Sequence, residues 1–233
     1  MKERAITLKA HDVRAILDGR KSQVRQVIKA VPTIYSFHGW VMSSTCAKDE
    51  GKACWAIGDS PLLRDPIRLN CPLGKIGDRL WVRETWQGPL VDYENANKLY
   101  KDPEPFQSIK NCVYKADGGV FPEYFDADDN LRYGWKSSTQ MPRWASRILL
   151  EITAVRVEHL QDISEEDAIA DGIITGRYGN EGNWLNGFYV PDNNQPYQTA
   201  KAAYAELWRS IHGVDSWYRN SWVWVVEFKQ VTA

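Results

Sequence analysis

The sequence lacks any long hydrophobic run. No apolar stretch approaches the roughly 18 residues that a membrane-spanning helix needs. The first apolar stretch is short and is broken by Lys9, His11 and Asp12, so we expect no signal peptide. The content of 43% hydrophobic and 25% charged residues is ordinary for a globular domain. We therefore expect a cytoplasmic protein that has no membrane-spanning segment.

Metal-binding patterns are also missing. The four cysteines contain no CxxC pair, and in a cytosolic chain they are expected to be reduced; they are Cys46, Cys54, Cys71 and Cys112. The four histidines are scattered without metal-ligand spacing; they are His11, His38, His159 and His212. We expect neither a metal ion nor another cofactor.

The chain has no excess of charge of one sign, because 29 Lys and Arg face 30 Asp and Glu. A net charge of −1 argues against binding a polyanion over the whole surface, but a local basic cleft remains compatible with it. Tryptophan is abundant instead, with 11 residues beside 11 tyrosines. Indole side chains favour cores, interfaces and base-stacking platforms. We expect most of them in the core and a few, beside arginine, at a ligand.

Hydrophobic periodicity predicts an α+β fold. Strands are predicted over residues 5–8, 22–28, 79–86, 147–157 and 222–229, and helices over 12–18, 164–171 and 197–211. Strands dominate without βαβ alternation, which favours a small closed or half-closed mixed sheet with two or three helices. We predict a single domain over residues 1–233. Its loop insertions lie at about 31–70 (carrying a small hairpin), 87–138 and 175–196.

A cation-rich turn follows the first helix, with the sequence GRKSQVR at residues 19–25. Gly19 can take a positive φ and end the helix, and Arg20, Lys21 and Arg25 follow it at once. Cations held at a helix end suit an anionic or nucleotide ligand. The alternative is that Lys21 is a solvated cation that interacts with the negative end of the helix dipole.

A second stretch interleaves charge with indole, in the sequence GDRLWVRETW at residues 77–86. Strand alternation places Glu84 on the face of Leu80 and Val82, so its carboxylate is expected to point inward or into a cleft. A buried carboxylate needs a partner or a raised pKa, and both are common at functional sites. Glu84 is therefore a catalytic candidate. The alternative is an ion pair inside the barrel with Arg79, Arg143 or Arg147.

Two further places put cations beside indoles, at Trp135-Lys136 and at Arg143-Trp144. Stacking of a base on an aromatic ring contributes about 1–3 kcal/mol, and arginine binds phosphate through two hydrogen bonds. The alternative is that Trp144 is core and the stem of Arg143 covers it. The residues predicted to contact nucleic acid are Arg20, Lys21, Ser22, Arg25, Arg83, Trp135, Lys136, Arg143 and Trp144.

The turn after the first helix resembles the ASCH domain of the PUA-like superfamily, in its phage and prophage form. The family signature is a glycine, a lysine two residues later, then a threonine or glutamate and an arginine. Gly19 and Lys21 match it, whereas Val24 stands at the threonine position and Gln26 at the arginine position. The runs at residues 77–86, 141–147 and 222–228 also look like this family, so the resemblance covers most of the chain outside the insertions.

The resemblance implies a PUA-like mixed β-barrel with a cleft for RNA, a nucleobase or a nucleoside. Some members are similar to amidohydrolases that remove an acyl group from cytidine by means of a lysine, a threonine and a glutamate. Carried over, the lysine is Lys21 and the acid falls near Asp171, one methylene shorter than glutamate. A lysine beside a hydroxyl favours deprotonation of that hydroxyl, but Val24 has none. Ser22 shares strand parity with Val24 and is a substitute candidate.

The expected function is therefore binding of RNA, DNA or a modified nucleoside, without a cofactor, by a phage or prophage accessory protein. One alternative is an amidohydrolase in which Lys21 activates a hydroxyl or water, and Asp171 or Glu84 accepts and donates the proton. A second is a ribonuclease that uses the same cations on the scissile phosphate. A third is an accessory protein that binds a host protein through its insertions.

Overall fold

A computed structural model describes residues 1–44, 46–58, 64–126, 128 and 130–232. The chain divides into two compact units. Unit 1 comprises Met1–Gly19, Arg79–Glu151 and Gln230–Ala233, and unit 2 comprises Arg20–Asp78 and Ile152–Lys229. The expectation of a single domain stays a prediction.

Unit 1 is built on a mixed sheet. Strand β1 (Glu3–Thr7) pairs in parallel with β6 (Arg79–Arg83), and β6 pairs antiparallel with the first residues of β11 (Leu149–His159). Helix α1 (Ala10–Leu17) follows β1. Gly19 adopts φ +70° and ends α1, as the sequence predicted.

The segment around residues 87–138 of unit 1 contains short elements. Strands β7 (Trp86–Gln87) and β8 (Val113–Tyr114) pair with each other, as do β9 (Glu123–Phe125) and β10 (Leu131–Tyr133). Helix α2 (Tyr93–Lys101) was not predicted. The described residues contain four α-helices, so the predicted number of two or three is corrected to four. No residue of α2 is buried, and its sequence YENANKLYK is mostly polar. It therefore lacks the apolar stripe by which a helix is recognised in a sequence, and the pattern predicted a loop.

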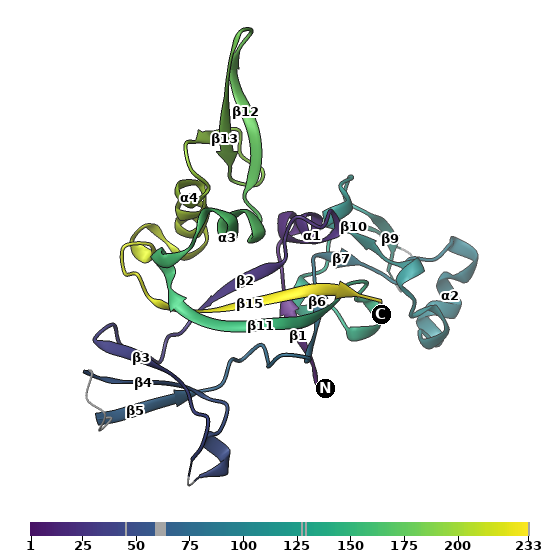
Figure 1. Cartoon of the computed structure of the whole chain (residues 1–233). Helices are drawn as coiled ribbons and strands as arrows, with labels where there is room; N and C mark the ends of the chain where they lie inside the picture. Colours follow the sequence, from purple (N-terminus) through teal and green to yellow (C-terminus); the bar gives the residue numbers. More distant parts are fainter. Residues whose placement is uncertain (45, 59–63, 127, 129, 233) are drawn as a thin grey trace. The chain divides into compact units, whose positions relative to one another are not determined.

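Unit 2 is built on the antiparallel pair of β2 (Gln23–Val27) and β15 (Trp222–Val231), with β11 on the other side of β15 (Figure 1). Helices α3 (Glu165–Ala170) and α4 (Ala200–His212) belong to the same unit. The apolar stripe that predicted α4 is buried, and it belongs to one core cluster with residues of β15. Members of this cluster include Ala203, Tyr204, Leu207, Trp208, Val223 and Val225.

The stretch at residues 31–70 is a three-stranded antiparallel sheet rather than a single hairpin. Its strands are β3 (Tyr35–Trp40), β4 (Ala53–Ile57) and β5 (Arg64–Leu69), with β4 in the middle. Four successive residues of β4 are buried, so this strand lacks the alternation that reveals a half-buried strand.

The segment at residues 175–196 was expected to be a loop, and this expectation is wrong. Strands β12 (Ile174–Asn180) and β13 (Asn183–Tyr189) form a long hairpin (Figure 1). Strand β14 (Pro196–Tyr197) pairs with β13 as a third strand. A Cβ atom at Gly179 would lie only 2.0 Å from the carbonyl oxygen of Asn183. The glycine thus permits close strand approach, although its presence in the sequence indicated a loop.

The structure confirms an α+β fold. No sheet in the described part of the chain closes into a barrel, and the PUA-like assignment stays a prediction. Among the described helices, none has both the length and the apolar character required to cross a membrane.

Candidate functional site

Lys21 and Asp171 meet in unit 2. Lys21 stands just before β2 and Asp171 just after α3, and the backbone N–H of Ser22 donates to the carbonyl of Ala170 at 2.9 Å. Lys21 Nζ donates to the carbonyl oxygen of Asp171 at 2.5 Å and also contacts its carboxylate. Each side chain is only 4% exposed. The lysine and the acid that the resemblance paired, 150 residues apart, therefore lie together.

The position of Asp171 follows from how α3 ends. The hydroxyl of Ser164 caps the start of the helix by accepting from the backbone N–H of Asp167, as the sequence predicted. At the other end, Gly172 N–H donates to Ile169 and Ile173 N–H donates to Ala168, which is a Schellman arrangement. Gly172 has φ +114°, a conformation that L side chains rarely adopt.

Arg25 extends the same site. Its side chain is 0% exposed, and its guanidinium contacts the carboxylates of Glu158, Asp167 and Asp171 at 2.8, 3.1 and 3.3 Å. Burial lowers the pKa of Arg25, but Asp171, Tyr204 and Glu158 outweigh it and hold the pKa above its usual value. The residue therefore stays charged.

Further groups complete this cluster. Arg156 contacts Glu158, Asp167 and Glu227, while Gln23 Nε2 donates to the carbonyl of Asp167 at 2.6 Å. We call the following residues the charge cluster: Lys21, Arg25, Arg156, Glu158, Asp167, Asp171 and Glu227. Three cations and four carboxylates give it a formal charge of −1. Tyr204 joins it from α4, where its hydroxyl donates to Asp171 at 2.9 Å.

The charge cluster predicts a pH dependence of stability. Burial raises the pKa of Asp167, but Gln23, Arg156 and Arg25 together bring it below its usual value of 3.8. A carboxyl whose pKa is lowered by folding stabilises the native state above 3.8 and loses this contribution as the pH falls through the lowered pKa. We expect Asp167→Asn to reduce the free energy of unfolding at pH 6, and this difference to shrink below pH 3.8. Urea unfolding of both proteins across this range measures it. A difference that does not change with pH would contradict the assignment.

Glu84 lies in unit 1 and forms the ion pair given as its alternative role. It is buried, and both of its carboxylate oxygens accept from Arg147, at 2.9 and 3.0 Å. Arg147 also pairs with Asp117 at 2.8 Å and lies over the ring of Tyr114 at 4.0 Å. Burial raises the pKa of Glu84, and the opposing effect of Arg147 is smaller.

The candidates for contact with nucleic acid differ in exposure. Arg20 and Ser22 are exposed in unit 2. In unit 1, the guanidinium of Arg83 lies 4.7 Å from the ring centre of Trp81. Arg143 is exposed, and its Nε donates to Glu3 at 3.0 Å. These four residues reach solvent or lie at half-buried positions. By contrast, Lys21 is buried against Asp171, and Arg25 is buried against three carboxylates.

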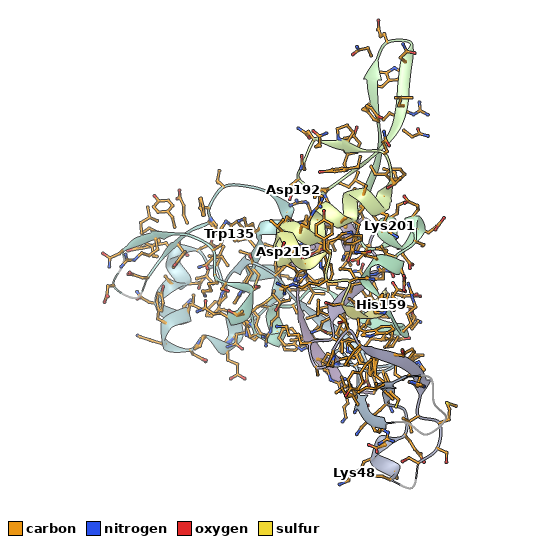
Figure 2. All side chains as sticks on the ribbon, turned by 90° about the vertical axis from the view of Figure 1, so that its left-hand side faces the viewer. Lys48, Trp135, His159, Asp192, Lys201 and Asp215 are labelled. Carbon is orange, nitrogen blue, oxygen red and sulfur yellow. The ribbon has the colours of Figure 1, made fainter. Side chains whose placement is uncertain are left out.

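The two indole candidates and Lys136 are all half-buried. Trp135, labelled in Figure 2, follows β10 by two residues and is half-buried. Lys136 Nζ donates to the carbonyl of Gly88 at 2.7 Å and lies 5.1 Å from the ring centre of Trp86. Trp144 packs edge-to-face against Trp86, with ring centres 5.7 Å apart. Trp144 is a partly buried residue packed against the core cluster that contains Trp86, and its contact with nucleic acid stays a prediction.

No group of three or more His, Cys, Asp and Glu side chains that could hold a metal ion occurs among the described residues. None of the four cysteines, all of them among the described residues, forms a disulfide. No family model, curated protein or solved structure matches the chain.

Several residues of the charge cluster region were not predicted. Gln23 had a usable signal, because it shares strand parity with Lys21 and Arg25. Tyr204 was assigned to the core by its helical spacing, which does not reveal where its hydroxyl goes. Glu158 and Asp167 gave no signal that distinguishes them from solvated surface acids.

Proposed function

We propose that this chain binds a nucleobase or nucleoside, free or within RNA, through an ASCH/PUA-like domain whose recognition group is the Lys21–Asp171 pair. The observation that supports the proposal is the contact of Lys21 Nζ with the carbonyl and carboxylate of Asp171. The pair sets a strong donor beside a strong acceptor, and the edge of a base carries the complementary groups.

The charge balance favours a base over a phosphate as the group recognised here. Four carboxylates surround the three cations of the charge cluster. A phosphate near Lys21 or Arg25 would meet repulsion from Asp171 and Glu158, whereas a neutral base edge would not. Any phosphate contacts of an RNA ligand are assigned to the exposed Arg20.

A second candidate function is removal of an acyl group from the exocyclic amine of cytidine. The observation that favours it is that a lysine, a carboxylate and the Tyr204 hydroxyl lie within hydrogen-bond reach in one cluster. Water would attack the acyl carbon, the C–N bond would break, and the amine would leave with a proton. Asp171 would accept the proton of the water and Lys21 would stabilise the oxyanion. Neither role needs a hydroxyl at Val24.

Calorimetric titration with cytidine and with cytidine acylated on its exocyclic amine tests both candidates. We expect Lys21→Met to weaken binding at least tenfold, because a charged hydrogen bond contributes about 1.5–3 kcal/mol. Lys29→Met removes an exposed lysine of the same unit and is the matched control, with nucleoside affinity unchanged. Release of free cytidine from the acylated form would select the amidohydrolase.

Lys21→Met leaves a buried carboxylate with fewer partners, so circular dichroism must show that the variant is folded. If Lys21→Met is not folded, Lys21→Arg, which keeps the positive charge, is titrated as the second variant. The proposal is wrong if folded Lys21→Met binds both nucleosides as tightly as the unmodified protein, or if neither nucleoside binds at all.

A further inference from the structure

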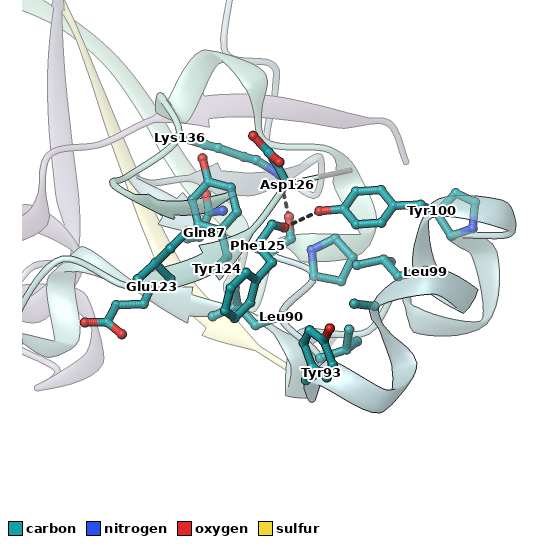
Figure 3. A pocket seen from close by; sticks show the side chains of 16 residues that line it. Gln87, Leu90, Tyr93, Leu99, Tyr100, Glu123, Tyr124, Phe125, Asp126 and Lys136 are labelled. Atoms are coloured by element: carbon teal, nitrogen blue, oxygen red, sulfur yellow. Dashed lines mark hydrogen bonds between the residues drawn. The ribbon is translucent and has the colours of Figure 1, made fainter. Parts of the chain in front are cut away.

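Unit 1 contains a cavity of about 740 Å³ whose lining comes entirely from residues 87–136. This volume lies within the range of roughly 300–1,000 Å³ that is usual for small-molecule sites. Helix α2 supplies Tyr93 and Tyr100 to its wall, and β9 supplies Tyr124 and Phe125 (Figure 3). The Tyr100 hydroxyl donates to the carbonyl of Phe125, and this bond ties α2 to β9. Aromatic walls of this kind suit a flat ring.

Gln87 contributes an acceptor without a partner. The residue is 3% exposed, and its side-chain oxygen is buried without a hydrogen bond to any described residue. A buried polar atom left unpaired reduces stability, and native proteins keep few of them. Gln87 also lines the cavity, so a rotation of its side-chain amide would bring this oxygen to a ligand N–H placed there.

Lys136 contributes a donor to the same cavity. Its ammonium donates to the carbonyl of Gly88 and lies over the indole of Trp86. No carboxylate among the described residues pairs with it. Burial lowers the pKa of Lys136, which is consistent with a cation that lacks a counter-charge. An oxygen acceptor on a ligand would supply part of the missing compensation.

We propose that this cavity binds a planar heterocycle whose edge carries an N–H next to a carbonyl oxygen, as in uracil and guanine. The ring packs among the side chains of Tyr93, Tyr124 and Phe125. The N–H donates to the oxygen of Gln87, and the carbonyl oxygen accepts from Lys136. This site is separate from the Lys21–Asp171 pair, and the inference does not depend on the proposed function.

Uridine and N3-methyluridine are the probes for calorimetric titration, because the methyl group removes only the N–H that Gln87 would accept. We expect uridine to bind at least tenfold more tightly, because a site built around a hydrogen bond rejects an analogue that lacks it. In Gln87→Met, the methionine side chain has a volume similar to that of glutamine but lacks the amide oxygen that would accept the hydrogen bond. We expect it to bind the two ligands equally and to unfold at a higher temperature, because the unpaired oxygen is gone.

Gln107→Met is the matched control, since Gln107 is exposed in the same segment and does not line the cavity. It should keep the preference for uridine. If Gln87→Met does not fold, Lys136→Met provides the second test and should weaken uridine binding. A short oligouridylate that competes with uridine indicates a base within RNA, and one that does not compete indicates a free nucleoside; both support the ligand class. The inference fails if the unmodified protein does not bind uridine or if Gln87→Met retains the preference.

Discussion

Arg25→Met is expected to reduce the free energy of unfolding by about 3–5 kcal/mol, the loss typical of breaking a buried ion pair by removing one partner. The Arg25 side chain is inaccessible to solvent and contacts Glu158, Asp167 and Asp171. Methionine fills much of the same space, so the loss reports the missing charge rather than a cavity. Urea unfolding at pH 7 measures it.

Arg156→Met is the control for this prediction. Arg156 shares Glu158 and Asp167 with Arg25, but its side chain is 34% exposed. Solvent screens an ion pair at such a position, and the expected loss is about 1 kcal/mol. Equal losses for the two variants would show that burial does not set the strength of these contacts.

Trp55→Ala is also expected to cost about 3–5 kcal/mol, because it removes a large buried ring and leaves a cavity. Trp55 lies on β4 and is 0% exposed. Its ring packs against Phe37, Trp222 and Trp224, with centres 5.4, 6.5 and 5.7 Å apart. Thermal or urea unfolding gives the loss directly.

Trp184→Ala controls for the loss of an indole as such. Trp184 lies on β13 and is 57% exposed, so its removal is expected to change stability by less than about 0.5 kcal/mol. Trp55→Phe should reduce the free energy of unfolding less than Trp55→Ala does, because the indole N–H of Trp55 has no hydrogen-bond partner among the described residues. A Trp55→Ala loss as small as that of Trp184→Ala would contradict the assigned core.

The sequence predicted the elements whose signals are local. A glycine ended α1 at Gly19, a serine capped α3 at Ser164, and alternation located β11 to within two residues at each end. Each signal depends on neighbours along the chain, which a single sequence contains. The hairpin of β12 and β13 escaped detection because the glycines that let its strands approach are also typical of loops.

The site was predicted only in outline. Lys21 and Asp171 were named together through the resemblance, but their burial against each other depends on a contact between residues 150 positions apart. Periodicity assigns a side chain to a face and does not say what covers that face. For this reason Glu84 was expected to point inward while its partner remained one of three arginines. The same limit hid the hydroxyl of Tyr204.

The brevity of α3 has a consequence for how this chain can vary. Six residues separate the Ser164 cap from Asp171, and each residue of an α-helix turns the chain by about 100°. Inserting one residue there would swing the carboxylate away from the ammonium of Lys21, so this helix tolerates no change of length. The hairpin tip at residues 181–182 contains no residue of the charge cluster, so a change of its length is expected to leave the contact of Lys21 with Asp171 intact.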